Sequence, residues 1–340
     1  MKTGIIGPGS QARKLVLAAE EIGQGLSYVV FRHREGLDLS FYEKRGARAV
    51  NDLSGLSGCD AIIIASANEA HFESLKSLFE SGYEGYIFLE KPPVTTSEGL
   101  EWLRKADDEL KKRIYFNFNY RHSPYAKSFK DDGARFGLGR MLNATVITGH
   151  GIGLKRDYAG TWRAKAGASA GGVFENVSIH FIDMLVSLYG APERFAVFNS
   201  NFSPYGDAAD NSAFSCRFCN GATLNVVASY TTAFISSVTA IYDNGAVVFG
   251  EDKKVYAPRE TFDESGMFAQ PPVIHSESVP RKEIAKASLR ESMKEFIGIV
   301  KGKKGVSHEW YDAGIETNRV AIEALNEYLT ESTKKEETSK

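Results

Sequence analysis

Short apolar runs alternate with helix-like segments over residues 1–121. Between the fourth and fifth runs, apolar residues recur at helical spacing from Phe72 to Phe79, and Gly82 follows them as a helix stop. Alternation of this kind is typical of βαβ units, so the runs predict a doubly wound parallel sheet, the Rossmann arrangement. The six runs cover residues 4–6, 28–31, 47–50, 61–65, 86–89 and 114–116.

Beyond residue 121 the apolar runs follow one another through turns instead of helices. Asp243-Asn244-Gly245 is a strong hairpin signal between two such runs. This part of the chain therefore predicts a C-terminal α/β domain built on an open, mostly antiparallel sheet. The predicted strands are residues 194–198, 213–218, 222–230, 237–242 and 246–249, and the predicted helices are residues 176–188, 283–301 and 311–329.

These patterns predict two domains and a tail. Residues 1–121 are expected to form a first domain on the doubly wound sheet, and residues 122–332 a second domain on the open sheet. A charged tail follows at residues 333–340, and the chain from Glu331 onward is expected to fray. The chain length of 340 residues also exceeds the usual size of a domain with a single hydrophobic core. Because an open sheet commonly buries its uncovered face against another copy, we expect a homodimer or homotetramer.

Composition and charge narrow the classes of function. Hydrophobic residues make up 43% of the chain and charged residues 25%, which excludes wholesale disorder. The formal net charge of -2 predicts no general attraction to nucleic acid or to an anionic membrane. The N-terminal apolar run is too short for a signal segment or a membrane span, and three cysteines suit a reducing compartment, so we expect a cytoplasmic protein.

Cys216 and Cys219 have the spacing of half a zinc site or of a redox pair. The residues around them are typical of a β-strand, which would place the two thiols on opposite faces. The sequence has no second Cys pair or His pair at metal-ligand spacing. We therefore predict no metal site.

A glycine-rich segment follows the first apolar run and opens an apolar helix. Gly7, Gly9 and Ala12 form the GxGxxA variant of the dinucleotide fingerprint. The first glycine permits a tight turn, the second a close approach to a pyrophosphate, and the alanine close helix packing. The amide groups and dipole of the helix N-terminus, where Ser10 and Gln11 lie, favour an anion. The segment therefore predicts a dinucleotide cofactor. Residues 1–121 are then expected to be a dinucleotide-binding Rossmann domain, and residues 122–332 the domain for substrate binding and oligomerisation.

The end of the second predicted strand bears on the choice between NAD and NADP. An acidic side chain there binds the ribose 2′-hydroxyl of NAD, whereas a cation accommodates the 2′-phosphate of NADP. The chain has Arg32 and Arg34 here, and Glu35 comes a few residues late for the acidic role. We predict NADP as the preferred cofactor and NAD as the second choice. The alternative is that both arginines lie on a solvated loop.

Further motifs follow in order along the chain. They are Ser66-Ala67-Asn68 with His71, Glu90-Lys91-Pro92, Asn119-x-Arg121, and Gly171-Gly172 before His180-x-x-Asp183. With the glycine-rich segment they resemble the glucose-fructose oxidoreductase / inositol dehydrogenase family of NAD(P)-dependent oxidoreductases over nearly the whole chain. The resemblance implies a Rossmann domain followed by an open α/β domain, an NAD(P) cofactor, and hydride transfer at a secondary alcohol or ketone, usually of a sugar or cyclitol.

The resemblance also implies roles for these residues. Substrate contacts would come from Asn119, Arg121, Arg163 and Asp183, and cofactor contacts from Ser66, Asn68, His71 and Glu90. Glu90 would orient its loop and take no part in the chemistry. Trp162-Arg163 resembles the family loop that contacts substrate, and with Lys155 and Arg156 it can bind a carboxylate or the phosphates of a sugar nucleotide. A solvated basic loop explains these cations equally well.

Lys91 is the first expected catalytic residue. A residue just past the carboxyl end of a parallel strand lies at the crevice where α/β sheets bind ligands, and Pro92 stiffens the backbone there. We predict that the Lys91 ammonium polarises the reacting oxygen. The alternative is an ordinary surface lysine.

Asn176, His180 and Asp183 are spaced i, i+4 and i+7, which predicts one shared helical face. An imidazole titrates near the operating pH, so we predict that His180 acts as general acid/base, against the alternative of a core histidine. Asp183 is expected to orient that ring or to accept a substrate hydroxyl.

The sequence departs from the family at Asn176, where an aspartate is usual. Asparagine carries no charge, so it stabilises the ammonium of Lys91 and the imidazolium of His180 less than a carboxylate would. Glu175 is no substitute, because it lies about 100° round an α-helix from that position. One alternative function is therefore a catalytically weak NADP(H)-binding sensor or partner protein. Another keeps catalysis and changes the substrate to a non-sugar carbonyl, such as a dihydrodiol or a tetrapyrrole.

Overall fold

The computed structural model describes residues 1–23, 27–31, 36–166 and 171–338, without the side chains of residues 281–282 and 327–338. The chain divides into two compact units. Unit 1 comprises Met1–Asn119 and Lys286–Arg319, and unit 2 comprises Tyr120–Ala285 and Val320–Lys340. This division differs from the predicted domains, because residues 286–319 return to the first unit and residues 120–121 belong to the second.

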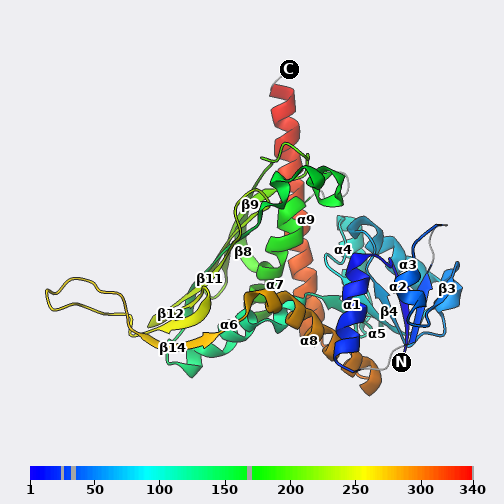
Figure 1. Cartoon of the computed structure of the whole chain (residues 1–340), viewed down its shortest axis with the longest axis horizontal. Coiled ribbons are helices and arrows are strands. Elements are labelled where there is room, and N and C mark those ends of the chain that lie inside the picture. Colours follow the sequence, from blue (N-terminus) through cyan, green and yellow to red (C-terminus); the bar gives the residue numbers. More distant parts are fainter. Residues whose placement is uncertain (24–26, 32–35, 167–170, 339–340) are drawn as a thin grey trace. The chain divides into compact units, whose positions relative to one another are not determined.

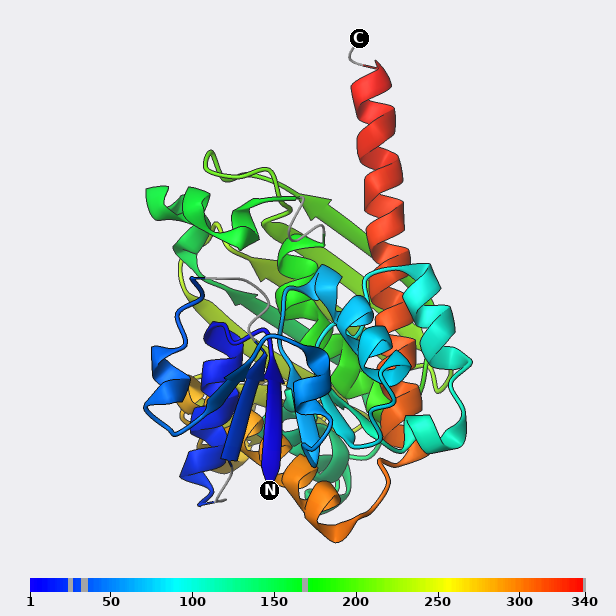
Figure 2. The same cartoon turned by 90° about the vertical axis from the view of Figure 1, so that its right-hand side faces the viewer.

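Unit 1 is built on a six-stranded parallel sheet, called sheet A, which confirms the predicted doubly wound fold (Figure 2). The strand order is β3-β2-β1-β4-β5-β6, so the order reverses between β1 and β4, where α/β sheets bind ligands. The strands are β1 (Lys2–Ile6), β2 (Ser27–Phe31), β3 (Arg48–Val50), β4 (Ala61–Ile64), β5 (Tyr86–Glu90) and β6 (Ile114–Asn117).

Aromatic packing explains why residues 286–319 belong to unit 1. Phe296 of α8 (Arg281–Gly302) lies 5.1 Å from Phe88 of β5 and 5.7 Å from Tyr115 of β6, measured between ring centroids. Trp310 of α9 (His308–Thr338) stacks on the same Tyr115 at 4.9 Å. Burial of these rings stabilises the unit strongly. The helices that contribute to unit 1 are α1 (Ser10–Glu21), α2 (Ser40–Glu43), α3 (His71–Glu80), α4 (Ser97–Arg104), α5 (Asp108–Lys111), α8 (Arg281–Gly302) and the start of α9 (His308–Thr338).

Unit 2 is built on an eight-stranded sheet, called sheet B, in the order β14-β13-β12-β11-β7-β10-β9-β8. Only β7 and β10 pair in parallel among its described strands, which confirms the mostly antiparallel sheet. The predicted hairpin joins β11 and β12, with Tyr242 opposite Gly245. The strands are β7 (Met141–Gly149), β8 (Pro192–Ser200), β9 (Asn211–Phe218), β10 (Thr223–Ser229), β11 (Ile235–Tyr242), β12 (Gly245–Phe249), β13 (Asp252–Tyr256) and β14 (Val273–Ser278).

The sequence did not predict β7, β13 or β14. The polar residues of β13 are typical of an exposed segment, yet Lys253 is buried and only 4% exposed. Its Nζ lies 2.8 Å from a carboxylate oxygen of Asp132 and 3.0 Å from one of Glu277. A lysine can be buried when carboxylates pair with it, and here they come from α6 (Pro124–Arg135) and β14, far away in the sequence.

Helices complete unit 2. Helix α6 begins where the Ser123 side chain accepts a hydrogen bond from the Ala126 amide, with Pro124 at its first position. Helix α9 is continuous to Thr338 (Figure 1), so the prediction of a frayed tail from Glu331 is wrong. Residues 331–338 contain no Gly or Pro and are rich in Glu and Lys, which favour an α-helix. The helices are α6 (Pro124–Arg135), α7 (Ile179–Tyr189) and the end of α9.

Unit 2 exposes apolar side chains on several strands of sheet B. Phe198 of β8 is 71% exposed, and Ile147, Val227 and Ile241 on β7, β10 and β11 are exposed too. The loop between β13 and β14, drawn in yellow, extends away from the sheet (Figure 1). The homo-oligomer stays a prediction.

Within the described ranges, no helix combines the length and the apolar character needed to cross a bilayer.

Candidate functional site

The glycine-rich segment lies at the carboxyl edge of sheet A, between β1 and α1. Gly7 has a φ of +75°, and a Cβ there would lie 2.3 Å from the backbone nitrogen of Ser66, so a larger residue does not fit. A Cβ at Gly9 would meet no described atom within 4 Å, which leaves open space before the helix. Ala12 is fully buried, as close helix packing requires. The tight turn and the close packing are thus both present.

The first turn of α1 suits the pyrophosphate of a dinucleotide. Among the described residues, no side chain caps this helix at Gly9, and its first turn holds no acidic residue. The amide groups and the helix dipole therefore favour an anion. Ser66 Oγ, just beyond β4, is buried and has no hydrogen-bond partner in the described part of the chain. These groups, together with Ser10 and the short 3-10 helix that begins at Asn68, fit the cofactor that the fingerprint implies.

Glu90 ends β5 and accepts three hydrogen bonds. Its Oε1 accepts from Gln11 Nε2 at 2.9 Å and from Asn117 Nδ2 at 2.7 Å, and its Oε2 accepts from the Lys91 amide at 3.3 Å. Ser292 donates to Asn117 Oδ1 at 2.8 Å, which fixes the direction of that amide. Burial raises the pKa of Glu90, and the bonds from the two amide side chains oppose the rise. Glu90 thus ties the first turn of α1 to β5.

Lys91 follows Glu90 directly and is half-buried at the carboxyl edge of sheet A. The next residue, Pro92, has its carbonyl oxygen 2.8 Å from His71 Nδ1. The other ring nitrogen of His71 lies 3.2 Å from the carbonyl oxygen of Ser66, and the residue is only 1% exposed. Both ring nitrogens therefore face backbone carbonyls, which argues against the predicted direct contact between His71 and the cofactor.

The two arginines that bear on the choice of cofactor are not among the residues whose positions are described above. Arg32 and Arg34 lie outside the described residues. The choice between NAD and NADP therefore rests on the sequence pattern alone.

Arg121 and Asp183 form a buried ion pair in unit 2. Arg121 Nε lies 2.7 Å from Asp183 Oδ2, and its Nη2 lies 2.6 Å from Oδ1, so the guanidinium grips the carboxylate with two parallel bonds. The two side chains are 5% and 0% exposed. Both were predicted to bind substrate. Their burial argues for a structural role, which holds α7 against the 3-10 helix Asn119–His122.

His180 stacks on Tyr120, with the ring centroids 4.7 Å apart and the planes inclined by 27°. Burial raises the pKa of Tyr120 to about 12, so its phenol stays neutral at physiological pH. Because Tyr120 and Arg121 are neighbours and contact His180 and Asp183, those two residues share one face of α7, as predicted. Tyr120 was not predicted as a site residue, although it occupies the middle position of the Asn119-x-Arg121 motif.

The helix that carries Asn176 differs from the prediction. Residues Phe174–Ser178 form a π-helical turn, and α7 begins only at Ile179. The 100° step of an α-helix therefore does not relate Asn176 or Glu175 to the residues of α7. Asn176 Nδ2 donates to the Gly172 carbonyl at 2.8 Å, and Glu175 Oε2 accepts from the Gly171 amide at 3.2 Å. Both side chains thus bond to the glycine pair before the turn.

Arg163 lies among aromatic side chains in unit 2. Its guanidinium carbon is 4.5 Å from the centroid of the Trp162 ring, and its backbone carbonyl accepts a 2.8 Å hydrogen bond from the Tyr158 hydroxyl. Tyr230 stacks on His150 at 5.0 Å. Burial lowers the pKa of His150, and the charge of Arg163 lowers it further, which places the two residues near each other. These aromatic neighbours were not predicted from the sequence, because strand and loop residues far apart in the chain meet there.

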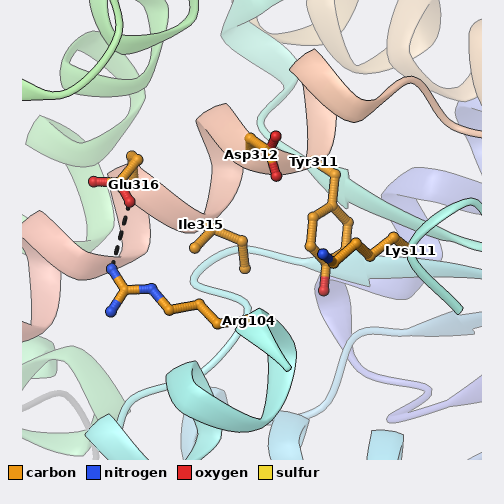
Figure 3. A pocket seen from close by; sticks show the side chains of 6 residues that line it. All are labelled: Arg104, Lys111, Tyr311, Asp312, Ile315 and Glu316. Atoms are coloured by element: carbon orange, nitrogen blue, oxygen red, sulfur yellow. Dashed lines mark hydrogen bonds and ion pairs between the residues drawn. The ribbon is translucent and has the colours of Figure 1, made fainter. Parts of the chain in front are cut away.

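A cavity of about 180 Å³ lies elsewhere in unit 1 (Figure 3). Its Arg104 pairs with Glu316 at 3.4 Å, and Lys111 lies 6.0 Å from the centroid of the Tyr311 ring. Helix α5 ends just before β6 begins, so this cavity lies toward the amino edge of sheet A. Ligands of α/β sheets bind at the opposite edge, which carries Gly7 and Lys91. The lining residues are Arg104, Lys111, Tyr311, Asp312, Ile315 and Glu316.

Proteins of known structure and curated relatives resemble this chain over most of its length. The 1,5-anhydro-D-fructose reductase of Ensifer adhaerens is 23% identical over 261 residues, covering 75% of this chain and 77% of that protein. Levoglucosan dehydrogenase, solved with NADH and levoglucosan, has a TM-score of 0.75 at 20% identity, covering 96% of this chain and 97% of its own. An oxidoreductase from Agrobacterium radiobacter, solved with NAD+, L-tartaric acid and magnesium, has a TM-score of 0.76 at 15% identity, covering 96% of each chain.

Family models match both units. Residues 1–118 match the oxidoreductase family with an NAD-binding Rossmann fold, and residues 134–256 match the GFO/IDH/MocA C-terminal domain. The first match covers the glycine-rich segment, Glu90 and Lys91, and the second covers Arg163, His180 and Asp183. With a Rossmann sheet followed by an open antiparallel sheet, the chain belongs to the GFO/IDH/MocA family of nicotinamide-dependent oxidoreductases.

Proposed function

We propose that the protein interconverts a secondary alcohol and a ketone on a sugar, cyclitol or sugar-nucleotide substrate, with NADP preferred over NAD. The observation that carries this proposal is the position of Lys91, which lies at the carboxyl end of β5 on the same sheet edge as the dinucleotide fingerprint. The relatives of this chain, which include a reductase of 1,5-anhydro-D-fructose and a levoglucosan dehydrogenase, support a sugar-like substrate.

The residues divide the work of the reaction. The hydride chemistry would come from a nicotinamide held at this edge of sheet A. The Lys91 ammonium stabilises the negative charge that develops on the reacting oxygen. His180 removes or returns the hydroxyl proton, and its stacking on Tyr120 restrains the orientation of the ring. Arg163 binds a hydroxyl or an anionic group of the substrate, supported by Trp162.

A substrate panel tests the proposal. Purified protein is incubated with NADPH or NADP+ and with 1,5-anhydro-D-fructose, levoglucosan, inositols and sugar nucleotides, and the absorbance of the reduced cofactor is followed. We expect saturable turnover with at least one member of the panel. Tight cofactor binding without turnover of any member would contradict the proposal and favour the sensor.

The cofactor preference makes its own prediction. Arg32→Ala combined with Arg34→Ala should weaken NADPH binding by about tenfold or more and leave NADH binding within a few-fold, because charge-assisted bonds to the 2′-phosphate are lost. Quenching of intrinsic fluorescence measures both affinities. Arg217→Ala, which removes an exposed arginine of unit 2 paired with Glu193, is the matched control. An unchanged ratio of NADPH affinity to NADH affinity in the double variant would show that these arginines do not bind the 2′-phosphate.

The family departure at residue 176 predicts a pH effect. If residue 176 faces the reacting centre, the negative charge of Asn176→Asp favours the imidazolium of His180, so the limb of the pH–rate profile that needs a neutral base should move to higher pH. Rates below that limb should fall. The new carboxylate cannot donate to the Gly172 carbonyl, so thermal unfolding must be compared with wild type.

The measurement uses saturating substrate and a rate limited by hydride transfer, as a deuterium isotope effect establishes. Asn220→Asp, in the exposed turn after β9, is the charge-matched control. An unshifted profile in folded Asn176→Asp protein would mean that residue 176 does not face the reacting centre.

A further inference from the structure

His71 is buried between two loops at the carboxyl edge of sheet A. It is the first residue of α3, and its ring nitrogens lie 2.8 Å from the Pro92 carbonyl oxygen and 3.2 Å from the Ser66 carbonyl oxygen. Those carbonyls lie just beyond β5 and β4 respectively. The ring therefore bridges the segment that carries Lys91 to the segment beside the glycine turn.

The two contacts of the ring are not equivalent. Carbonyl oxygens only accept hydrogen bonds, and a neutral imidazole has one N–H donor. Burial lowers the pKa of His71, although both carbonyl contacts oppose the shift, so the ring is neutral at physiological pH. The single proton belongs on Nδ1, which makes the shorter contact, to Pro92. The contact to Ser66 then brings no hydrogen bond.

This bond completes a clamp on the backbone of Lys91. On one side, the Lys91 amide donates to Glu90 Oε2 at 3.3 Å. On the other side, the carbonyl of Pro92 is held by His71. Both holding side chains are buried, so neither is free to follow a movement of the loop.

We propose that His71 is a positioning residue for Lys91, and that its Nδ1–H fixes the Pro92 carbonyl and with it the backbone that aims the lysine. The proposal rests on the proposed role of Lys91 in the reaction. Loss of the bond leaves a buried carbonyl without its donor and lets the segment move. A displacement of about 1 Å at a reacting group costs about a hundredfold in rate, so an effect on turnover is expected.

Two substitutions separate the two ring nitrogens. In His71→Asn the side-chain amide nitrogen takes the place of Nδ1 and can still donate to Pro92, whereas in His71→Gln it reaches the place of Nε2 and can donate only toward Ser66. We expect His71→Asn to keep turnover within about fivefold of wild type and His71→Gln to lose about tenfold or more. The affinity for NADPH should stay within a few-fold in both, because the glycine-rich segment is unchanged.

Two further measurements do not depend on turnover. Nitrogen-15 NMR of wild-type protein should show the Nδ1–H tautomer at His71, and an Nε2–H tautomer would overturn the proposal even if a variant fails to fold. After reductive methylation with carbon-13 formaldehyde, the Lys91 signal is identified by its loss in Lys91→Met. It should keep its chemical shift in His71→Asn and move in His71→Gln.

The outcomes distinguish this proposal from the proposed function. Equal turnover and equal Lys91 shifts in the two His71 variants would overturn the positioning role. Wild-type turnover in Lys91→Met would instead overturn the role of Lys91 itself, while the NMR shifts still report on its position. If both roles are right, adding His71→Gln to Lys91→Met should reduce turnover no further.

Discussion

Replacing Lys91 with methionine should lower turnover by about a hundredfold or more, as expected for the loss of a group that stabilises charge on the reacting oxygen. Methionine keeps an unbranched side chain of similar reach and removes only the ammonium. Cofactor affinity should stay within a few-fold, because the turn at Gly7 and the first turn of α1 do not depend on the lysine side chain. Steady-state kinetics with the best substrate of the panel, together with a cofactor titration, measures both quantities.

Lys105→Met is the matched control, since Lys105 is an exposed lysine of the same unit at the end of α4. It should behave like wild type in both assays. Turnover of Lys91→Met at the wild-type level would remove Lys91 from the mechanism. A large loss of cofactor affinity in Lys91→Met would show that the lysine binds the cofactor and would leave its chemical role unproven.

Removing the charge of Asp183 should destabilise unit 2 by about 3–5 kcal/mol, the usual result of breaking a buried ion pair. Asp183→Asn takes away the carboxylate charge that faces the buried Arg121 guanidinium, because the two side chains are 5% and 0% exposed. Chemical denaturation, followed by tyrosine or tryptophan fluorescence, measures the change. If the pair is structural, turnover per folded molecule should stay within a few-fold of wild type at low temperature.

Two comparisons sharpen this prediction. Glu193→Gln, which breaks the exposed pair with Arg217, should change stability by less than about 1 kcal/mol. Asp183→Leu combined with Arg121→Met should recover much of the loss, since an apolar pair needs no charge compensation. An Asp183→Asn protein as stable as wild type but without turnover would restore Asp183 as a substrate ligand.

Most of the local structure could be predicted from the sequence. The six strands of sheet A and the hairpin at Asp243-Asn244-Gly245 were recognisable because apolar periodicity and turn chemistry depend on near neighbours in the chain. The requirement for glycine at residue 7 was recognisable for the same reason. What the pattern could not reveal is that the nearest atom to a Cβ at Gly7 belongs to Ser66.

The features that the sequence did not predict depend on distant partners. Lys253 is buried because Asp132 and Glu277 pair with it, and the sequence around β13 does not indicate either partner. His71 carries a family motif, yet its role follows only from the two carbonyls around its ring. The π-helical turn before α7 likewise could not be predicted from a periodicity that is assumed to be uniformly α-helical.

The return of residues 286–319 to the first unit limits how this protein can be divided. A fragment that ends at residue 121 would lose Met293, Phe296, Ile297 and Val300 from the core that they share with sheet A. Aromatic rings of β5 and β6 would then face water, and such a fragment should aggregate during expression. Anyone who wishes to transplant the nucleotide-binding half onto another enzyme must therefore carry the later helix along, for example by joining residue 286 to the shortened chain through a flexible linker.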